Sequence, residues 1–312
     1  MATRETGAPG PYAGTVSIPT SPVPVRGGTR DAGEVLDLVA GRRFVALTGA
    51  GMSTDSGIPD YRGPGAPARM PMTYGEFVSG PTAQQRYWAR SHVGWSRMRR
   101  AEPNDGHRAL AALEAGGRVR LLVTQNVDGL HEAAGSRSLC ALHGRIAEVV
   151  CLGCQAVTSR SGLHERLTEA NPGWGERHAD VAVRPDGDVE LDDTAGFVVP
   201  GCPTCGGVLK PHVVFFGENV PKPRVERCYA AVEALEPARE LLVVLGSSLS
   251  VMSGFRFVRR AVRNGVPVVV VNRGVTRAAD LPVRHLEHGT TEFLTSLLRM
   301  VSPPGGSSTH GV

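Results

Sequence analysis

The chain has few lysines, little net charge and no long apolar run. Its 34 basic side chains include only two lysines, Lys210 and Lys222, and its formal net charge is +4 over 312 residues. We interpret the arginine bias as an effect of a GC-rich genome and not as a binding patch. So small a charge does not indicate a nucleic-acid surface or an anionic membrane as a partner. No segment approaches the roughly eighteen apolar residues of a membrane helix.

The N-terminal segment lacks the continuous apolar core of a secretory signal. Residues 1–30 are rich in Pro, Gly and Thr, and the prolines interrupt any amphipathic helix that a transit peptide would need. We therefore expect residues 1–30 to be a disordered leader and the protein to be cytoplasmic. We expect residues 302–312, which begin Ser-Pro-Pro-Gly-Gly, to be a flexible tail.

The chain does contain a regular alternation of apolar runs and helical segments. Short apolar runs typical of strands lie at residues 44–48, 119–123, 213–216, 241–245 and 267–271. Helical segments lie at residues 31–40, 84–99, 104–115, 223–235, 253–264 and 291–300. Because the strand-like runs are continuously apolar, they predict a parallel sheet that is covered on both faces. We therefore predict an open, doubly wound, Rossmann-like α/β fold.

The character of the chain changes near Ile146. Residues 146–206 contain two C-x-x-C pairs and Asp- and Gly-rich turns, and strand-like and helical patterns return after residue 206. We predict a small zinc-binding domain at residues 146–206, inserted into a large domain of residues 31–145 and 207–301. With 41% hydrophobic residues, the chain can bury a core of the size that such a large domain needs.

Four of the six cysteines form the pairs Cys151/Cys154 and Cys202/Cys205. In an intracellular chain this spacing favours zinc over disulfides, and a redox motif would not occur in two widely separated copies. Four thiolates complete a tetrahedral set with no open position for water, so we predict one structural zinc ion. Cys140 and Cys228 stand alone, and we interpret them as small buried residues.

Polar and glycine-rich segments follow four of the predicted strands, and folds of this class bind ligands at the carboxyl ends of their strands. The segments are residues 49–62, 124–131, 246–248 and 272–274. In the first, Gly49 and Gly51 suit a phosphate-facing turn, although Thr54 takes the place of the third glycine of G-x-G-x-x-G. Any one of these segments also fits a helix cap or a turn, but four of them predict a nucleotide site.

Three motifs resemble those of a known family. They are GAGMSTDSGIPDYR at Gly49–Arg62, TQNVDGLH at Thr124–His131, and His143-Gly144 a short distance ahead of the first cysteine pair. Together they resemble the signatures of the sirtuins, the NAD-dependent protein deacylases. The resemblance extends over residues 31–300. It agrees with the doubly wound sheet and the zinc-bearing insert that the residues themselves predict.

Some features of the chain resemble one branch of that family. The sequences at Val93-Gly94-Trp95, 171–174 and 185–188 are most similar to class II sirtuins. Three residues depart from the usual pattern, since Tyr61 replaces a Phe, His212 replaces an acid and Ser253 replaces a frequent Pro. The resemblance implies that the aromatic ring of Tyr61 retains a flat lid over the nicotinamide pocket, whereas the other two changes leave the peptide preference open.

The resemblance implies that NAD binds as a cosubstrate across the strand ends. Its pyrophosphate lies on the turn at 49–53 and on Ser247, its nicotinamide lies near Ile58 and Asp60, and Asn272 reads the adenosine ribose. The cofactor-binding positions implied in this way are Gly49, Ala50, Gly51, Ser53, Ile58, Asp60, Tyr61, Arg62, Gln125, Asn126, Gly246, Ser247, Ser248, Asn272, Arg273 and Gly274.

The resemblance also implies the catalytic residues. Asn126 and Asp128 orient the nicotinamide ribose while the acyl-lysine carbonyl oxygen attacks the anomeric carbon and nicotinamide leaves. His143 then deprotonates a ribose hydroxyl, which attacks the imidate carbon. An imidazole with an ordinary pKa of ~6.5 can accept that proton close to neutral pH. The products are nicotinamide, deacylated lysine and O-acyl-ADP-ribose, and we expect the rival histidine, His131, to face the sheet or cap its helix.

The implied partner is an acylated lysine of a protein, bound as an added strand between two walls of a groove. One wall consists of Val214, Phe215, Phe216, Gly217 and Glu218, and the other of residues 250–255. Phe215 also fits plain core packing. Tyr87 and Arg90, three residues apart on one helix face, resemble the pair with which some class II sirtuins bind acidic acyl groups. The alternative is that Tyr87 packs against the domain and Arg90 is solvated.

Two other functions stay open. One is mono-ADP-ribosylation of proteins in the same site, and the other is a non-catalytic NAD-sensing module with zinc as an interaction platform. The presence of His143, Asn126 and Asp128 argues against the sensor, because a sensor does not need a base. The target protein, the acyl group and the oligomeric state are not indicated by any of these patterns.

Overall fold

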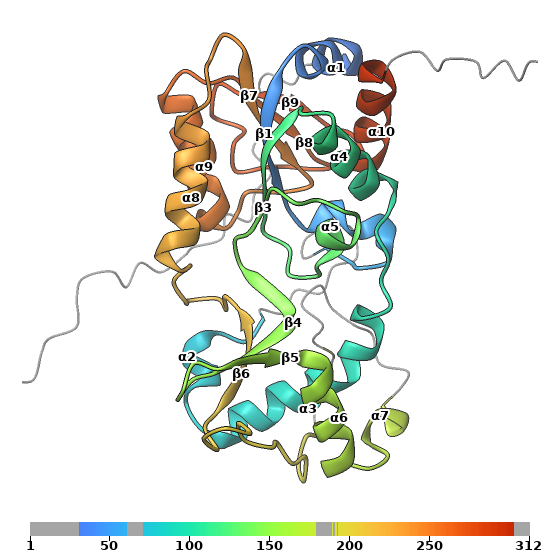
Figure 1. Cartoon of the computed structure of the whole chain (residues 1–312), viewed down its shortest axis with the longest axis vertical. Coiled ribbons are helices and arrows are strands. Elements are labelled where there is room, and N and C mark those ends of the chain that lie inside the picture. The colour runs from blue at the N-terminus through green and yellow to red at the C-terminus, as the bar shows by residue number, and fades with distance from the viewer. Residues whose placement is uncertain (1–30, 61–70, 179–188, 190, 192, 303–312) are drawn as a thin grey trace, which may run out of the picture.

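The computed structural model describes residues 31–60, 71–178, 189, 191 and 193–302. The predicted leader, residues 1–30, lies outside these residues, as does the predicted tail beyond residue 302. The described chain forms a six-stranded and a three-stranded sheet, which lie toward opposite ends of the molecule (Figure 1). Within the described segments, no helix is both long enough and apolar enough to cross a membrane.

The large sheet is parallel throughout and has the strand order β3-β2-β1-β7-β8-β9. Its strands are β1 (Arg43–Thr48), β2 (Val119–Thr124), β3 (Leu139–Ala141), β7 (Glu240–Leu245), β8 (Val268–Val271) and β9 (Arg284–Leu286). Strands β7 and β8 are buried along their whole length, and β1 along all but its first residue. Burial on both faces explains why these strands are continuous apolar runs.

Helices cover both faces of this sheet (Figure 1). One face packs against α1 (Ala32–Ala40), α4 (Asp105–Ala115) and α10 (Thr290–Val301), and the other against α8 (Lys222–Glu233) and α9 (Met252–Arg263). Side chains alternate along each strand, so Phe44 and Ala46 of β1 join the first core whereas Val45 and Leu47 join the second. The predicted doubly wound α/β class is confirmed.

The small sheet is antiparallel, with the order β5-β4-β6. It contains β4 (Gly144–Cys151), β5 (Val157–Ser159) and β6 (Leu209–Val213), and it packs with α2 (Tyr74–Phe77), α3 (Pro81–Met98), α6 (Arg160–Ala170) and α7 (Trp174–Arg177). Phe77 of α2 and Trp88 of α3 share one core with Val149 and Leu163. Helices before residue 146 therefore pack on the small sheet, and the domain boundaries at 146 and 206 stay a prediction.

The predicted strand at residues 213–216 is wrong in place and in partner. Strand β6 ends at Val213 and pairs antiparallel with β4 instead of joining the parallel sheet. Beyond it, Glu218 Oε2 accepts the N–H of Phe215 at 2.8 Å and Gly217 has a φ of +77°, so the chain turns. The run at 213–216 is apolar because Phe215 packs into the core beside the small sheet. A run of only four apolar residues does not distinguish such packing from a strand.

Buried histidines make the stability of this fold sensitive to acid. Burial lowers the pKa of His92 to about 3 and the pKa values of His107 and His164 to about 4, and it holds the pKa of His131 well below its usual value. The unfolded chain takes up protons at these side chains below about pH 6.5, whereas the folded chain stays neutral until about pH 4. The free energy of unfolding therefore falls as pH drops through this window.

We expect a lower melting temperature at pH 5 than at pH 7, and a smaller difference between the two in His107→Gln. His107 lies at the third position of α4, where its ring accepts the N–H of Asn104 in a capping box, and glutamine can take over that bond without titrating. The partly exposed His178, changed to Gln, serves as the control. Equal pH dependence in wild type and His107→Gln would contradict the prediction.

Candidate active site

The four polar segments predicted from the sequence meet at one edge of the large sheet. Strands β2, β1, β7 and β8 are consecutive neighbours and run parallel, so their carboxyl ends lie side by side. The loops that follow these strands begin at Gly49, Gln125, Gly246 and Asn272. The structure therefore brings together the residues that the sequence separates by more than 200 positions.

The first loop packs against the third at backbone distance. A Cβ on Gly49 would lie 2.7 Å from Ser247 Cβ, and a Cβ on Gly51 would lie 2.9 Å from Gly246 Cα. Gly246 also has a φ of +60°, which other residues adopt only under strain. Two short 3₁₀ turns, Ala50–Met52 and Thr54–Ser56, complete the loop in place of a regular helix. The glycine pair is thus required by the close contact between the loops that follow β1 and β7.

A chain of hydrogen bonds joins the first loop to the second. Asn126 Nδ2 donates to Gly49 O and to Ser53 Oγ, both at 3.0 Å. Ser53 Oγ donates to Asp128 Oδ2 at 2.7 Å, and Asp128 Oδ1 accepts the N–H of Leu130, in α5 (Leu130–Ala133), at 2.9 Å. Burial raises the pKa of Asp128, and the bonds from Leu130 and Ser53 act in the opposite direction. The predicted ribose-orienting pair, Asn126 and Asp128, is therefore fixed through Ser53.

His143 lies beside this network with both ring nitrogens engaged. Its Nδ1 is 2.9 Å from the carbonyl oxygen of Gln125, which can only accept, so the ring proton resides on Nδ1. Its Nε2 is 2.7 Å from Ser253 Oγ, which donates to it. Burial lowers the pKa of His143 to about 4, so the ring is neutral at pH 7 with a lone pair on Nε2. This is the protonation state of a general base.

Ser253 is a site residue whose contact was not predicted. From the sequence it is a departure that leaves the peptide preference open, but the structure places its hydroxyl on the nitrogen of the predicted base. The signal in the sequence was its position near the start of α9, which follows the loop after β7. Gln125 makes two contacts in the site. Its carbonyl oxygen accepts from His143 Nδ1, and its side chain donates to Ser247 Oγ at 2.9 Å.

The rival histidine has a structural environment. His131 Nε2 is 3.0 Å from the hydroxyl of Thr48 at the end of β1, and only 1% of the residue is exposed. Its ring packs against that of His107, with centroids 4.7 Å apart. The expectation that His131 faces the sheet is confirmed.

The remaining predicted NAD-binding residues lie in loops, and hydrogen bonds within two of these loops fix their shape. Asn272 Nδ2 donates to the carbonyl oxygens of Arg273 and Gly274, and Ser248 Oγ is 3.0 Å from Ser250 Oγ. Ile58 is 6% exposed and packs in a small cluster with Trp95, Met98, Leu130 and Ile146. Ala50 and Asp60 lie in the first loop, whereas Tyr61 and Arg62 fall outside the described residues.

The predicted substrate wall lies against the segment that bears His143. The N–H of Val214 donates to the carbonyl oxygen of His143 at 2.8 Å, and Phe216 O accepts the N–H of Tyr74 at 2.9 Å. Glu218 forms an ion pair of 2.9 Å with Lys210, which is 3% exposed. Phe215 packs edge-on against Phe77, which confirms its share in the core.

The predicted acyl-reading pair lies on α3. Tyr87 packs between Phe77 and Phe215, with ring centroids 5.5 and 5.2 Å away. Arg90 Nε and Nη2 donate to the carbonyl oxygen of Leu191 at 3.0 and 2.8 Å. The packing of Tyr87 agrees with the alternative, in which this side chain belongs to the core. Arg90 differs from that alternative, because it is bonded to Leu191 and is not simply solvated. The acyl-reading role stays a prediction.

The four paired cysteines converge as a metal centre requires. Their Sγ atoms all lie within 4.8 Å of one another, with Cys151 and Cys205 at 3.5 Å and Cys154 and Cys202 at 3.8 Å. Four sulfurs at about 2.3 Å from a tetrahedral zinc ion are roughly 3.8 Å apart, so the cluster has the right size. The N–H groups of Cys154 and Gly153 point at Cys151 Sγ and lower its pKa, which favours the thiolate.

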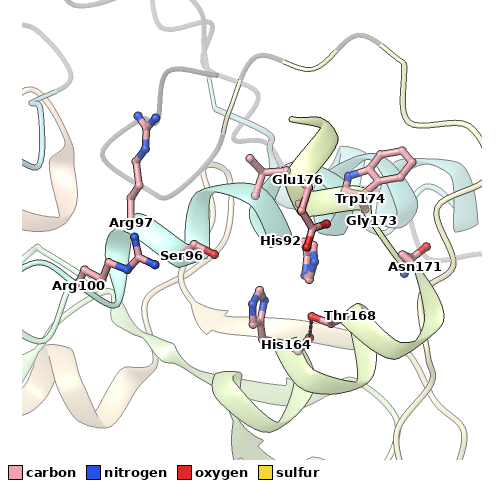
Figure 2. A pocket seen from close by; sticks show the side chains of 12 residues that line it. His92, Ser96, Arg97, Arg100, His164, Thr168, Asn171, Gly173, Trp174 and Glu176 are labelled. Carbon is pink, nitrogen blue, oxygen red and sulfur yellow. Dashed lines mark hydrogen bonds between the residues drawn. The ribbon is translucent and has the colours of Figure 1, made fainter. Parts of the chain in front are cut away.

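A separate cavity of about 380 Å³ lies between α3, α6 and α7. Figure 2 shows His92 and His164 facing one another inside it, and their ring centroids are 4.4 Å apart. Arg97, Arg100 and Trp174 also line it. None of the strand-end residues lines this cavity, so it is distinct from the predicted NAD site.

Comparisons with known proteins agree with this geometry. The model of the Sir2 family matches residues 49–253. The chain is 49% identical over 279 residues to "NAD-dependent protein deacetylase 1" of Mycobacterium avium (strain 104), which covers 88% of this chain and 98% of that protein. It is 52% identical over 260 residues to "NAD-dependent protein deacetylase" of Xanthomonas axonopodis pv. citri (strain 306), covering 82% and 87%. The solved structure "Sir2-p53 peptide-NAD+" matches with a TM-score of 0.67 and 30% identity over 86% of this chain and 98% of that one. The chain therefore belongs to the Sir2 family.

Proposed function

We propose that this chain removes acyl groups from lysine side chains of proteins, with NAD as the cosubstrate. The observation that carries the proposal is the neutral His143, whose Nε2 has a lone pair for a proton and whose Nδ1 is held by the carbonyl oxygen of Gln125, the residue before Asn126 of the Asn126–Ser53–Asp128 network. Membership of the Sir2 family and the names of its relatives, NAD-dependent protein deacetylases, support the same activity.

The strand ends have the features that NAD requires. The crowded glycine turn and Ser247 would hold the pyrophosphate, Ile58 and Asp60 the nicotinamide, and Asn272 the adenosine ribose. NAD supplies an electrophilic anomeric carbon, which accepts the acyl oxygen as nicotinamide leaves. Asn126 and Asp128 then have a positioning role, because Ser53 fixes both side chains before the substrate arrives.

His143 moves the proton. Its Nε2 accepts the proton of a ribose hydroxyl, and the carbonyl oxygen of Gln125 keeps the Nδ1–H in place, which stabilises the imidazolium that forms. In the structure the hydroxyl of Ser253 occupies Nε2, so the ribose hydroxyl has to displace it. Burial favours the neutral base before the transfer and the return of the proton after it.

The protein substrate would lie beside the segment at 214–218. A peptide strand added along this segment would place its acyl-lysine near His143, because the N–H of Val214 is bonded to the carbonyl oxygen of His143. Residues 250–255 would form the opposite wall, which includes Ser253. The solved "Sir2-p53 peptide-NAD+" structure is named for a peptide complex, which is consistent with this kind of substrate.

The activity is tested by incubating the zinc-loaded chain with NAD and an acetyl-lysine peptide. We expect one nicotinamide, one deacylated peptide and one O-acetyl-ADP-ribose for each turnover. Transfer of label from NAD to protein, without O-acetyl-ADP-ribose, would indicate a mono-ADP-ribosyltransferase. Binding of NAD with neither product would indicate a sensing module. Either result would overturn the proposal.

We propose further that Tyr87 and Arg90 favour acidic acyl groups such as succinyl. A guanidinium next to a phenol suits a carboxylate, and one charge-assisted bond contributes ~1.5–3 kcal/mol, or roughly ten- to a hundredfold in selectivity. We expect Arg90→Met to lower the ratio of desuccinylation to deacetylation by at least about tenfold.

The ratio is the informative measurement because Arg90 also bonds to Leu191. Loss of that structural bond would slow both reactions alike and cancel in the ratio. Arg86→Met is the matched control, since Arg86 lies one helical turn away and pairs with Glu76 at the surface. A wild-type preference for acetyl, or an unchanged ratio in Arg90→Met, would contradict the acyl-reading role.

A further inference from the structure

Two cysteines outside the metal centre are in contact, although they are 88 positions apart. Cys140 lies on β3 and Cys228 on α8, and their Sγ atoms are 3.5 Å apart. Both side chains are buried, with 4% and 0% exposed. A disulfide has a sulfur–sulfur distance of about 2.05 Å, so the two sulfurs need to approach by about 1.5 Å. Strand β3 is the edge of the sheet and α8 is an outer helix, so neither is held on all sides.

The surroundings of the pair favour a reactive thiolate at Cys140. The S–H of Cys228 donates to Cys140 and lowers the pKa of Cys140 to about 7, and the guanidinium groups of Arg227, Arg224 and Arg145 act in the same direction against burial. The same contact raises the pKa of Cys228. Cys140 is therefore the member of the pair that ionises first, and the thiolate is the form that reacts with oxidants.

The position of Cys140 links it to the predicted base. His143 is three residues further along the same segment, and Leu142 between them donates its N–H to Thr124 O at 2.9 Å. Arg227 of α8 already donates to Leu139 O at 2.9 Å, so helix and strand are coupled at this point. A displacement of Cys140 toward α8 pulls on the segment that holds His143. A misplacement of about 1 Å at catalytic groups can cost ~10²-fold in rate.

We propose that Cys140 and Cys228 form a reversible disulfide that slows the enzyme by drawing β3 toward α8. Hydrogen peroxide is the oxidant, and it is small enough for a buried pair that opens only locally. The Cys140 thiolate attacks one peroxide oxygen, which gives a sulfenic acid and a hydroxide that takes up a proton as water. Cys228 then loses its proton and attacks the Cys140 sulfur, and the sulfenic hydroxyl leaves as a second water. Two thiols lose two electrons, one peroxide gains them, and a dithiol reductant reverses the reaction.

The test uses the full, zinc-loaded chain treated with hydrogen peroxide. After alkylation without reduction, we expect a peptide map with a cross-link between the peptides of Cys140 and Cys228 and a loss of two hydrogens per chain. We expect turnover to fall about tenfold and to return with dithiothreitol. Cys228→Ala should keep its basal turnover and lose its sensitivity to peroxide. Zinc content is measured in the same samples, because oxidation of the metal thiolates would also inactivate the enzyme.

The regulatory part of this inference rests on the proposed function, whereas the cross-link does not. A folded, peroxide-treated chain without the cross-link overturns the inference whatever its activity. A cross-link that leaves turnover unchanged, or equal sensitivity of wild type and Cys228→Ala with loss of zinc, overturns the regulatory part. A chain that forms the cross-link but never deacylates, even when reduced, supports the disulfide and contradicts the proposed function instead.

Discussion

Replacement of His143 by alanine is expected to lower kcat by ~10²-fold or more while the fold and the affinity for NAD stay largely unchanged. The loss follows from the geometry, because Nε2 of this ring carries the lone pair that accepts the proton, and Nδ1 is held by the carbonyl oxygen of Gln125, next to Asn126. The measurements are single-turnover release of acetyl groups, calorimetric binding of NAD and the circular dichroism of the variant. His288→Ala, which changes a partly buried histidine in the loop before α10, serves as the control. Near-normal turnover in a folded His143→Ala variant would remove His143 from the mechanism.

The pH profile gives an independent check of the same assignment. Burial lowers the pKa of His143 to about 4, so the base stays neutral well below the ordinary value of about 6.5. We expect kcat/KM to stay level from pH 8 to about 5 and to decrease only below that, as the ring takes up a proton. The profile is measured at a temperature where the acid-sensitive fold remains intact. A midpoint near 6.5 would mean that the ring is solvated in the working enzyme.

The arrangement of the candidate NAD site followed from local features of the sequence. Each of its loops directly follows an apolar run, so Gly49, Gln125, Gly246 and Asn272 could be assigned to strand ends without knowledge of the partner strands. Parallel pairing then places them at one edge, since all carboxyl ends of such a sheet point the same way. The cysteine pairs were equally clear, because C-x-x-C brings two thiolates together by its local turn alone.

The features that escaped prediction all depend on contacts between distant residues. The pairing of β6 with β4 decides that residues 209–213, and not 213–216, form the strand. The contact of Ser253 with His143 spans 110 positions and that of Cys228 with Cys140 spans 88. The periodicity of a segment does not encode such a contact. From the sequence, Ser253 is therefore only a departure from the family pattern, and Cys140 and Cys228 are only small buried residues. One contact is made by the predicted base itself, and the other lies three residues before it in the chain.

The largest effect on stability is expected from the metal centre. Purified protein should contain one zinc ion per chain, and Cys151→Ala or Cys205→Ala should abolish its binding. A structural zinc site contributes ~10 kcal/mol or more of folding free energy, so loss of one ligand should unfold the small sheet at ordinary temperatures. Thermal melting followed by tryptophan fluorescence reports this directly, because all three tryptophans, Trp88, Trp95 and Trp174, lie on α3 and α7.

Loss of zinc should also abolish turnover, although no cysteine of the cluster lies among the strand-end residues. Strand β4 begins at Gly144, next to His143, and ends at Cys151 of the predicted metal centre. Strand β6 follows the second cysteine pair and leads to Val214, which is bonded to the carbonyl oxygen of His143. When the small sheet unfolds, His143 loses the support of both strands. Cys228→Ala is the matched control, since it removes a buried thiol outside the cluster and should retain one zinc ion and full turnover. Protein without zinc by elemental analysis, or with the visible absorbance of an iron–sulfur cluster, would show that the four thiolates serve another purpose.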